Sequence, residues 1–514
     1  MKQGISFAQK KGTLIALACA AAFAAPQAAN AQKEPFEVMK LDGHPLTLQG
    51  NISGGYARNK TTGSAGGASV DGAEKGNIWS GESNVRFSAS TKLSDGFVRG
   101  VGFQVESGYE TSDGSVSVSQ GTLASRNTGI GMKTDWGTLF AGRWDTPFKQ
   151  AMGGYYATTA SMGLGLSTTG FLGTPGFGTG SFNGAGGNVT GGTATAGTMS
   201  FRRRQANSMH YYTPELAGFK AGFMYTPDEE TGVGSVTQKA TAFGASLAYN
   251  RGPLSVQLSL EKHEDYAWGS AVGSRLAGTG NANVGLNTAA TAVTAGGVST
   301  AAAGNQVLVG NTSAGGTGGN SSDRALSLGV SYDFGSVQLQ GYWERLTYGQ
   351  TAAPGTTAAA GPGLPLTSLA SLAGTTGLAG AAGLVNLRGI ESNKYLVSGT
   401  WNVSGPHTLV GAYGKAMSLS CDATANWSGS CADTGAQIFN FLYRYKLDKV
   451  TYINLGYTQL NNDRNGNFVA SNSQGATTAA SAVNVSATAA ATNTVTASNG
   501  HKDSGWTLGL QTSF

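Results

Sequence analysis

The feature that most constrains this chain is a two-residue alternation of apolar and polar side chains, which recurs along most of its length. In one clear case, Leu326, Leu328 and Val330 alternate with small or polar residues up to a tight Asp-Phe-Gly-Ser turn, and the alternation then resumes. Side chains of a β-strand point alternately to opposite faces. The pattern therefore predicts a hairpin with one apolar face and one polar face.

Sixteen segments of this kind can be counted, and the connections between them alternate in length. The segments are predicted to begin near Leu46, Gly81, Phe97, Ser125, Gly137, Arg202, Gly218, Thr241, Pro253, Arg324, Ser336, Lys394, His407, Gln437, Val450 and Asp503. Seven connections are short and eight are longer. The longest span about 145–201, 263–322, 347–392 and 461–502.

Two architectures compete for this pattern. A soluble β-sandwich also alternates, but it does not require connections of strictly alternating length. A bacterial transmembrane barrel does require them, together with an even number of strands and an apolar outer face. Lipid offers no water to an open sheet edge, so the sheet must close. The sequence thus predicts an all-β fold: a 16-stranded antiparallel transmembrane β-barrel with short periplasmic turns and long outer loops. Aromatic residues expected in its interfacial girdles include Tyr249, Phe334, Trp401, Tyr445 and Phe514.

Residues 1–31 are predicted to be a cleaved signal peptide, and residues 32–514 the barrel. Three lysines precede a short apolar run, and Ala29-Asn30-Ala31 supplies the small residues of a cleavage site. Cys19 leaves a lipoprotein signal as the alternative. No later stretch is long and apolar enough for a transmembrane helix. The net charge of +5 gives little support to nucleic-acid binding.

Cys421 and Cys431 are the cysteines that remain after the signal peptide. In an exported protein, two cysteines this close predict a local disulfide. No histidine or further cysteine stands nearby, so a metal site is not expected.

The chain resembles the general trimeric porins of Gram-negative outer membranes, especially those of β-proteobacteria. The most specific matches are "SRNTGIGMKTDWGTLFAGRWDTPF" from Ser125, "RQANSMHYYTPELAGFKAGFMY" from Arg204, and the terminal Phe514. The resemblance implies that the third long loop, about 145–201, folds inward and narrows the channel. It also implies that the assembly machinery of the outer membrane recognises Phe514. The loops here are longer than in the family and rich in glycine, alanine and threonine.

The same resemblance implies a homotrimer surrounded by outer-membrane lipid and lipopolysaccharide. Small residues let flat barrel walls approach closely. Three of them are expected to face outward near the matching segment, namely Gly129, Gly131 and Ala141.

Three consecutive arginines, Arg202 to Arg204, follow the expected inward loop. If Met209 faces outward, alternation places Arg202 and Arg204 in the lumen, whereas Arg203 points the other way or lies in the loop. Alternation also places Arg86 in the lumen. The alternative interpretation is that the arginine run is only a solvated loop end.

Further charged residues are assigned to the constriction by family position or by their place in the loop. Arg126 resembles part of the basic ladder of general porins, and Glu106 resembles the wall carboxylate that pairs with this ladder. The inward loop contains Lys149 and no acidic residue after Asp145. Positive charge without opposing carboxylates should favour small anions. Alternatively, Arg86 and Glu106 only stabilise the wall.

No enzyme constellation, cofactor motif or metal-spaced histidine pair is found in the sequence. His210 with a nearby serine is the only candidate for a hydrolase. Two non-enzymatic alternatives to a general porin stay open. One is a barrel-anchored surface interaction or adhesion protein, because the long loops are of low complexity. The other is a substrate-selective porin for sugars, which would need an aromatic track. The inward aromatic residues Tyr212, Tyr342 and Tyr452 are too scattered to show one.

Overall fold

The computed structural model describes most of the strands and part of the inward loop. The described residues are 46–62, 73–80, 83–93, 96–108, 124, 126–156, 171–174, 201–233, 236–264, 321–350, 387–423, 431–464, 466, 468, 483–484, 494–495, 500 and 502–514. The predicted signal peptide lies outside these residues.

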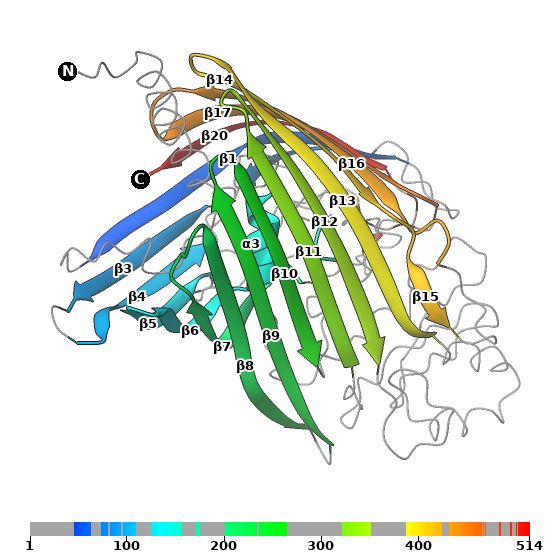
Figure 1. Ribbon diagram of the computed structural model, residues 1–514. Coiled ribbons are helices and arrows are strands. Elements are labelled where there is room, and N and C mark those ends of the chain that lie inside the picture. The colour runs from blue at the N-terminus through cyan, green and yellow to red at the C-terminus, as the bar shows by residue number, and fades with distance from the viewer. Residues whose placement is uncertain are drawn as a thin grey trace, which may run out of the picture.

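One antiparallel sheet dominates the structure and closes on itself (Figure 1). Its strands are β1 (Thr47–Thr62), β2 (Ala73–Ser80), β3 (Asn84–Lys92), β4 (Val98–Gly108), β5 (Thr128–Thr134), β6 (Gly137–Asp145), β7 (Arg204–Tyr212), β8 (Phe219–Val233), β9 (Val236–Arg251), β10 (Leu254–Glu264), β11 (Ser321–Asp333), β12 (Val337–Gln350), β13 (Leu387–Ser404), β14 (His407–Ala416), β15 (Ser420–Ala423), β16 (Ala436–Lys446), β17 (Thr451–Asn462) and β20 (Lys502–Ser513). β1 pairs with β20 from Asn51 opposite Ser513 to Thr62 opposite Lys502, and this pairing joins the first and last strands of the ring. The short strands β18 (Val483–Asn484) and β19 (Thr494–Val495) pair separately, and helix α3 (Pro147–Gly154) follows β6.

The wall consists of sixteen strands in the described part of the chain, as the sequence predicts. β2 and β3 follow one another along β1 and form one wall strand. β14 and β15 follow one another along β13 in the same way. The long connection expected before Thr241 is wrong, because β8 and β9 remain paired as far as Val233 and Val236.

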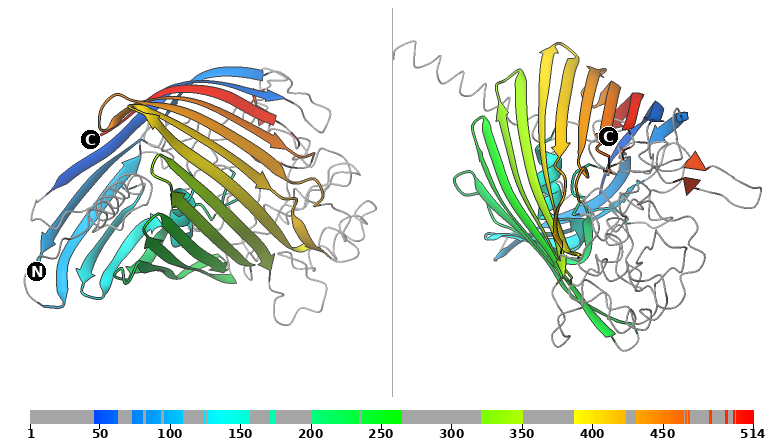
Figure 2. Two further views of the ribbon diagram at one scale, coloured as in Figure 1. Left: turned by 45° about the horizontal axis from the view of Figure 1, so that its top comes forward. Right: turned by 90° about the vertical axis from the view of Figure 1, so that its right-hand side faces the viewer.

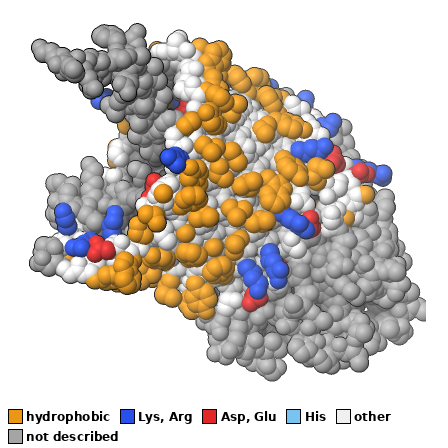
Figure 3. All heavy atoms as spheres, in the orientation of Figure 1, with side chains coloured by type: hydrophobic (Ala, Val, Ile, Leu, Met, Phe, Trp, Pro, Cys, Tyr) orange, Lys and Arg blue, Asp and Glu red, His pale blue; other side chains and the backbone are white. Residues whose placement is uncertain are grey.

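The outer face of the wall is apolar. Exposed apolar side chains cover the strands in Figure 3, and Leu258, Leu328 and Val397 are examples from β10, β11 and β13. Such a band matches the hydrocarbon layer of a membrane. Among the described residues, no helix has the length and apolarity needed to cross a membrane.

The expected outward position of Gly129 and Gly131 is wrong. Gly129 lies opposite the buried Gln104, and a Cβ on Gly131 would come within 2.3 Å of the Phe140 side chain, which is buried inside the barrel. Ile130 between the two glycines is 69% exposed and points outward.

The interior is polar on one side and apolar on the other. Helix α3 lies inside the ring of strands and contacts β8 to β11 (Figures 1 and 2). Phe148 and Met152 of α3, together with Phe171 and Phe201, belong to a buried cluster with inward apolar residues of the wall. These wall residues are Ala325, Tyr342, Leu346, Tyr348, Leu396, Ala416, Ala436, Ile438 and Leu460. The simple expectation of a polar inner face therefore fails here, because the inward loop covers this part of the wall.

Candidate functional site

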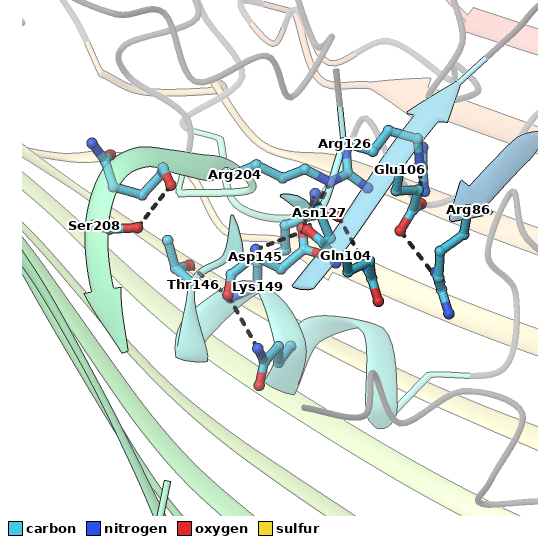
Figure 4. Close-up of polar contacts among 12 residues, drawn as sticks. Arg86, Gln104, Glu106, Arg126, Asn127, Asp145, Thr146, Lys149, Arg204 and Ser208 are labelled. Atoms are coloured by element: carbon cyan, nitrogen blue, oxygen red, sulfur yellow. Dashed lines mark hydrogen bonds and ion pairs between the residues drawn. The ribbon is translucent and has the colours of Figure 1, made fainter. Parts of the chain in front are cut away.

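Glu106 is the centre of one charged group on the inner wall. Its side chain is 1% exposed and accepts hydrogen bonds from Arg86 Nη2 at 3.2 Å and from Arg126 Nε at 2.6 Å. Arg86 and Glu106 are direct partners across β3 and β4, and Arg126 lies two residues before the start of β5 (Figure 4). The structure thus brings together the three wall residues that sequence reasoning assigned to the basic ladder and its carboxylate.

Asp145 is the centre of a second charged group, at the point where the chain leaves β6 for the inward loop. Its carboxylate is fully buried and lies 2.5 Å from Lys149 Nζ and 3.4 Å from Arg204 Nε. Asn127 donates a hydrogen bond from Nδ2 to Asp145 at 2.8 Å, and its Oδ1 accepts one from Arg204 at 3.2 Å. Because Asn127 follows Arg126 directly, the Asp145 group is joined to the Glu106 group through the backbone.

The turn into the lumen is fixed by the start of α3. Thr146 caps the helix, with its Oγ1 accepting a hydrogen bond from the Lys149 N–H at 3.2 Å, and Pro147 occupies the first turn. Gln150 donates from Nε2 to the Asp145 carbonyl at 3.1 Å and to the Tyr212 hydroxyl at 2.6 Å. The helix was not predicted, although Thr-Pro is a typical helix start. It places Lys149 directly over Asp145.

The arginine run lies differently from the expectation. β7 begins at Arg204, so Arg202 and Arg203 precede the strand, where alternation does not apply. Within β7 the register shifts near Asn207, which has a φ of 49°. Arg203 is 1% exposed and donates from Nη2 to Gln205 Oε1 at 2.5 Å. Its predicted direction, away from the interior, is therefore wrong, and its alternative position in the loop is the observed one.

The two groups contain more positive than negative charge. Glu106 and Asp145 are two carboxylates, whereas Arg86, Arg126, Arg204 and Lys149 are four basic side chains paired with them, and the charge of Arg202 acts on Lys149 as a fifth. Burial, followed by the nearby Arg204 charge, lowers the pKa of Lys149 to about 7, against the attraction of Asp145. When Lys149 is protonated, the excess is three positive charges. The expectation of basic residues without opposing carboxylates is thus corrected, since Asp145 itself opposes Lys149 and Arg204.

The inward loop is hydrogen-bonded to a buried ion pair of the opposite wall. Lys394 Nζ lies 2.7 Å from Glu344 Oε1, and both side chains are 0% exposed. The two residues are direct partners across β12 and β13. The Gly173 N–H donates to both oxygens of Glu344, at 2.9 and 3.2 Å, and the Gly173 carbonyl accepts from the Phe201 N–H at 2.8 Å. The turn at Gly173 therefore connects the wall to the chain that leads into Arg202.

Sequence reasoning missed Asn127, Glu344 and Lys394. Asn127 could have been suspected from its place beside Arg126. Alternation along β12 puts Glu344 on the same face as Tyr342, but its pairing with Lys394 depends on a register across the long connection 351–386, which no local pattern reveals.

His210 and Ser208, the candidate hydrolase pair, are both buried, with Ser208 Oγ 2.9 Å from His210 Nε2. Within the described residues, Nδ1 of His210 has no hydrogen-bond partner, so no third group orients the ring. Ser208 instead donates to backbone carbonyls, including that of Gly142 at 3.0 Å.

Cys431 is disulfide-bonded. The side chain of its predicted partner, Cys421, lies outside the described part of the structure, so the pairing stays a prediction.

Comparisons with known proteins point to one family. A family model described as Gram-negative porin matches residues 16–312 and 269–467. The chain is 38% identical over 68 residues to outer membrane porin protein 32 of Delftia acidovorans, covering 13% of this chain and 19% of that protein. It is 28% identical over 178 residues to a chitoporin of Vibrio furnissii, covering 34% of this chain and 40% of that protein. The matches thus span well under half the length of either relative.

The fold is shared with solved porins. The anion-selective porin from Comamonas acidovorans superposes with a TM-score of 0.55 at 18% identity, covering 91% of this chain and 99% of that chain. The family match extends over most of the chain, and the closed sheet agrees with it. The chain therefore belongs to the Gram-negative porin family, whose members are outer-membrane β-barrels and not enzymes.

Proposed function

We propose that the protein forms a water-filled diffusion channel for small hydrophilic solutes and that its constriction favours anions. The observation that carries the preference is the charge around the lumen, where four basic side chains pair with two buried carboxylates and Arg202 adds a fifth positive charge near Lys149. A barrel of sixteen strands is wide enough for an aqueous lumen. The low-dielectric wall concentrates the field of this excess charge on the lumen.

The arrangement of the carboxylates supports the same direction. Glu106 is buried behind Arg86 and Arg126, and the side chain of Arg86 remains 22% exposed. An ion in the lumen is therefore expected to meet guanidinium groups before it meets the carboxylates. The porin of Comamonas acidovorans is called anion-selective, but at 18% identity its likeness extends only to the fold. The proposal rests on the charges of this chain.

The test is the reversal potential in a potassium chloride gradient, measured on purified protein in planar bilayers. We expect chloride preference that is strong in dilute salt and fades toward molar salt, since the Debye length falls from about 30 Å at 0.01 M to about 3 Å at 1 M. Arg86→Gln with Arg202→Gln should shift the reversal potential toward potassium. Arg99→Gln is the matched control, because Arg99 pairs with Asp135 at an exposed turn. Potassium preference of the unmodified channel at low salt would refute the proposal.

A sugar-selective channel is less well supported. Among the described aromatic residues, Tyr342 and Tyr212 are buried, and Tyr342 packs against Tyr156 of the inward loop. Tyr452 lies beneath the guanidinium of Arg444, 4.6 Å from the ring centre. These rings are held by protein contacts and do not form a continuous exposed track.

The functional unit in this proposal is a homotrimer. The outward residues of β1, β3, β4 and β5 include Ile52, Phe87, Phe103 and Ile130, all of them apolar and exposed in the single chain. Such a face can pack against a second copy or against lipid. Samples kept unheated in detergent should migrate as trimers and convert to monomers on boiling. Light scattering that finds one monomeric species in mild detergent would contradict the trimer.

A further inference from the structure

A separate cation faces the lumen near the short turns, away from the two charged groups described above. Arg444 lies on β16, two residues before the strand ends at Lys446. Its side chain points inward, because Leu442 on the same face is buried whereas Phe441 on the outer face is exposed. Arg444 itself is only half-buried, so part of the residue is open to the lumen.

Neutral side chains hold the guanidinium of Arg444 in one orientation. Its Nε donates to Asn454 Oδ1 at 2.9 Å, and its Nη2 donates to Gln511 Oε1 at 3.0 Å. The guanidinium also lies over the ring of Tyr452, with 4.6 Å between its carbon and the ring centre. Gln511 in turn donates to Asn51 Oδ1 at 3.3 Å. These contacts orient the cation without cancelling its charge, because amides and a phenol are neutral at pH 7.

The Arg444 site lies closer to the turns than the constriction does. Arg86 stands six residues before the end of β3 at Lys92, and Arg444 stands two residues before the end of β16. Both strands run toward the turn side, and a strand rises about 3.3 Å per residue, so the two arginines differ in level by roughly 13 Å along the strands. This separation exceeds the Debye length of about 8 Å at physiological salt, so the two sites act on ions separately.

A second positive charge stands between Arg444 and the turn. Lys446 is the next inward position of β16, and it is exposed. Asp448 lies in the turn that follows, where its carboxylate accepts hydrogen bonds from the N–H groups of Val450 at 2.8 Å and Thr451 at 2.9 Å. The backbone therefore holds this acid in the turn. A solute that enters from the turn side meets Lys446 first and Arg444 next.

The ligand that suits an oriented guanidinium is an oxyanion. The N–H donors of a guanidinium form a planar fork that matches two oxygens of a carboxylate or phosphate group, whereas a halide ion offers no such pair. A side chain that is already held in place also loses less entropy on binding. The bonds of Arg444 link β16, β17 and β20 from the inside as well, but a purely structural link does not require a cation that is open to the lumen.

We propose that Arg444, with Lys446 beside it, is a second anion-binding site of the lumen, which takes the carboxylate or phosphate group of a permeating solute on the turn side of the constriction. The inference rests on the water-filled channel proposed above, but not on the ion that the constriction prefers. Oxyanions should stay at this site longer than chloride does. The site thus discriminates among anions, which the net charge of the constriction does not do.

The experiment measures block of the single-channel chloride current in molar potassium chloride, where a Debye length of about 3 Å leaves mainly direct contacts. Inorganic phosphate and acetate are titrated separately at pH 7, which distinguishes the two kinds of oxyanion, and the readout is the half-blocking concentration. Arg444→Gln should raise this concentration roughly tenfold or more, because a charge-assisted hydrogen bond is worth about that factor. Lys449→Gln is the matched control, since it removes a positive charge from an exposed position of the same turn, and it should leave the readout unchanged.

Two further variants exclude a loss of folding and a general effect of charge. Gln511→Glu keeps Arg444 in place but sets a carboxylate against its Nη2, and it should weaken the block as strongly as Arg444→Gln does. Arg444→Lys keeps the charge without the planar fork and should weaken the block as well. The proposal is overturned if neither probe blocks the unmodified channel, if the block survives in Arg444→Gln, or if Arg444→Lys is blocked as readily as the unmodified protein.

The reversal potential of the same channels separates this inference from the anion preference of the constriction. Chloride preference together with an unaltered block in Arg444→Gln would refute the Arg444 site alone. Potassium preference together with a block that Arg444→Gln removes would refute the anion preference alone and would support the site.

Discussion

Glu344 offers a direct test of how the inward loop is held against the wall. Its carboxylate forms a fully buried ion pair with Lys394 and accepts the Gly173 N–H with both oxygens. Glu344→Gln keeps an oxygen that can accept from Gly173 but leaves the Lys394 charge buried without its counter-charge. Removing one partner of a buried ion pair typically costs about 3–5 kcal/mol.

This cost applies to the state in which the loop is docked. An undocked loop admits water to Lys394, so the variant loses stability mainly in the docked form. A loss of about 3–5 kcal/mol changes the docking equilibrium by a factor between about 10² and several times 10³. Undocking would also displace Arg202, because Gly173 is hydrogen-bonded to Phe201, the residue before it.

The assay is single-channel recording in planar bilayers, combined with the reversal potential. We expect Glu344→Gln to show frequent transitions between conductance levels and weaker chloride preference, while the unmodified channel is steady. Glu344→Gln with Lys394→Met should restore the steady channel, because replacing both charges of a buried pair is often nearly neutral. The matched control is Glu391→Gln, which breaks an exposed pair on the same two strands and should cost about 0–1 kcal/mol. Steady conductance in Glu344→Gln, or a double variant as unstable as the single one, would refute the reasoning.

The remaining predictions concern the charge of Lys149, the disulfide between Cys421 and Cys431, and the role of Phe514 in assembly. Raising the pH from 6 to 8 should reduce chloride preference, because Lys149, with a pKa of about 7, loses its positive charge over that range. Lys149→Met should remove this pH response. An unchanged response in the variant would show that another group titrates. Cys421 and Cys431 are expected to form a disulfide, which would stabilise the folded loop by roughly 2–4 kcal/mol without affecting the barrel. Free thiols at both positions in mass spectra of protein isolated from the outer membrane would contradict the disulfide. Deleting Phe514 should lower the yield of protein in the outer membrane but not the conductance of assembled channels. The reason is that the Phe514 backbone forms two hydrogen bonds of 3.0 Å with Gly50 where the barrel closes. A normal yield would contradict a role of Phe514 in assembly.

The sequence by itself determined the wall of the barrel. Alternation along strands such as β11 and β12 is a local property, and the apolar face must meet lipid wherever the strand lies. Strand number, strand order and the inward direction of Arg86 and Glu106 follow from it. The family motifs then identified Arg126 beside Glu106, a contact that the structure places at 2.6 Å.

The tertiary structure alone decided how the interior is filled. Apolar residues such as Leu346 and Leu396 point inward because a loop segment distant in sequence covers them. The sequence around these residues does not indicate which segment that is. The same holds for Asp145, which the sequence presents as the lone acid at a loop start but which the fold buries between Lys149 and Arg204. Alternation specifies to which face of the sheet a side chain points. What that side chain meets in the lumen depends on where the inward loop docks, and docking is set by contacts between residues far apart in sequence, such as Gly173 and Glu344.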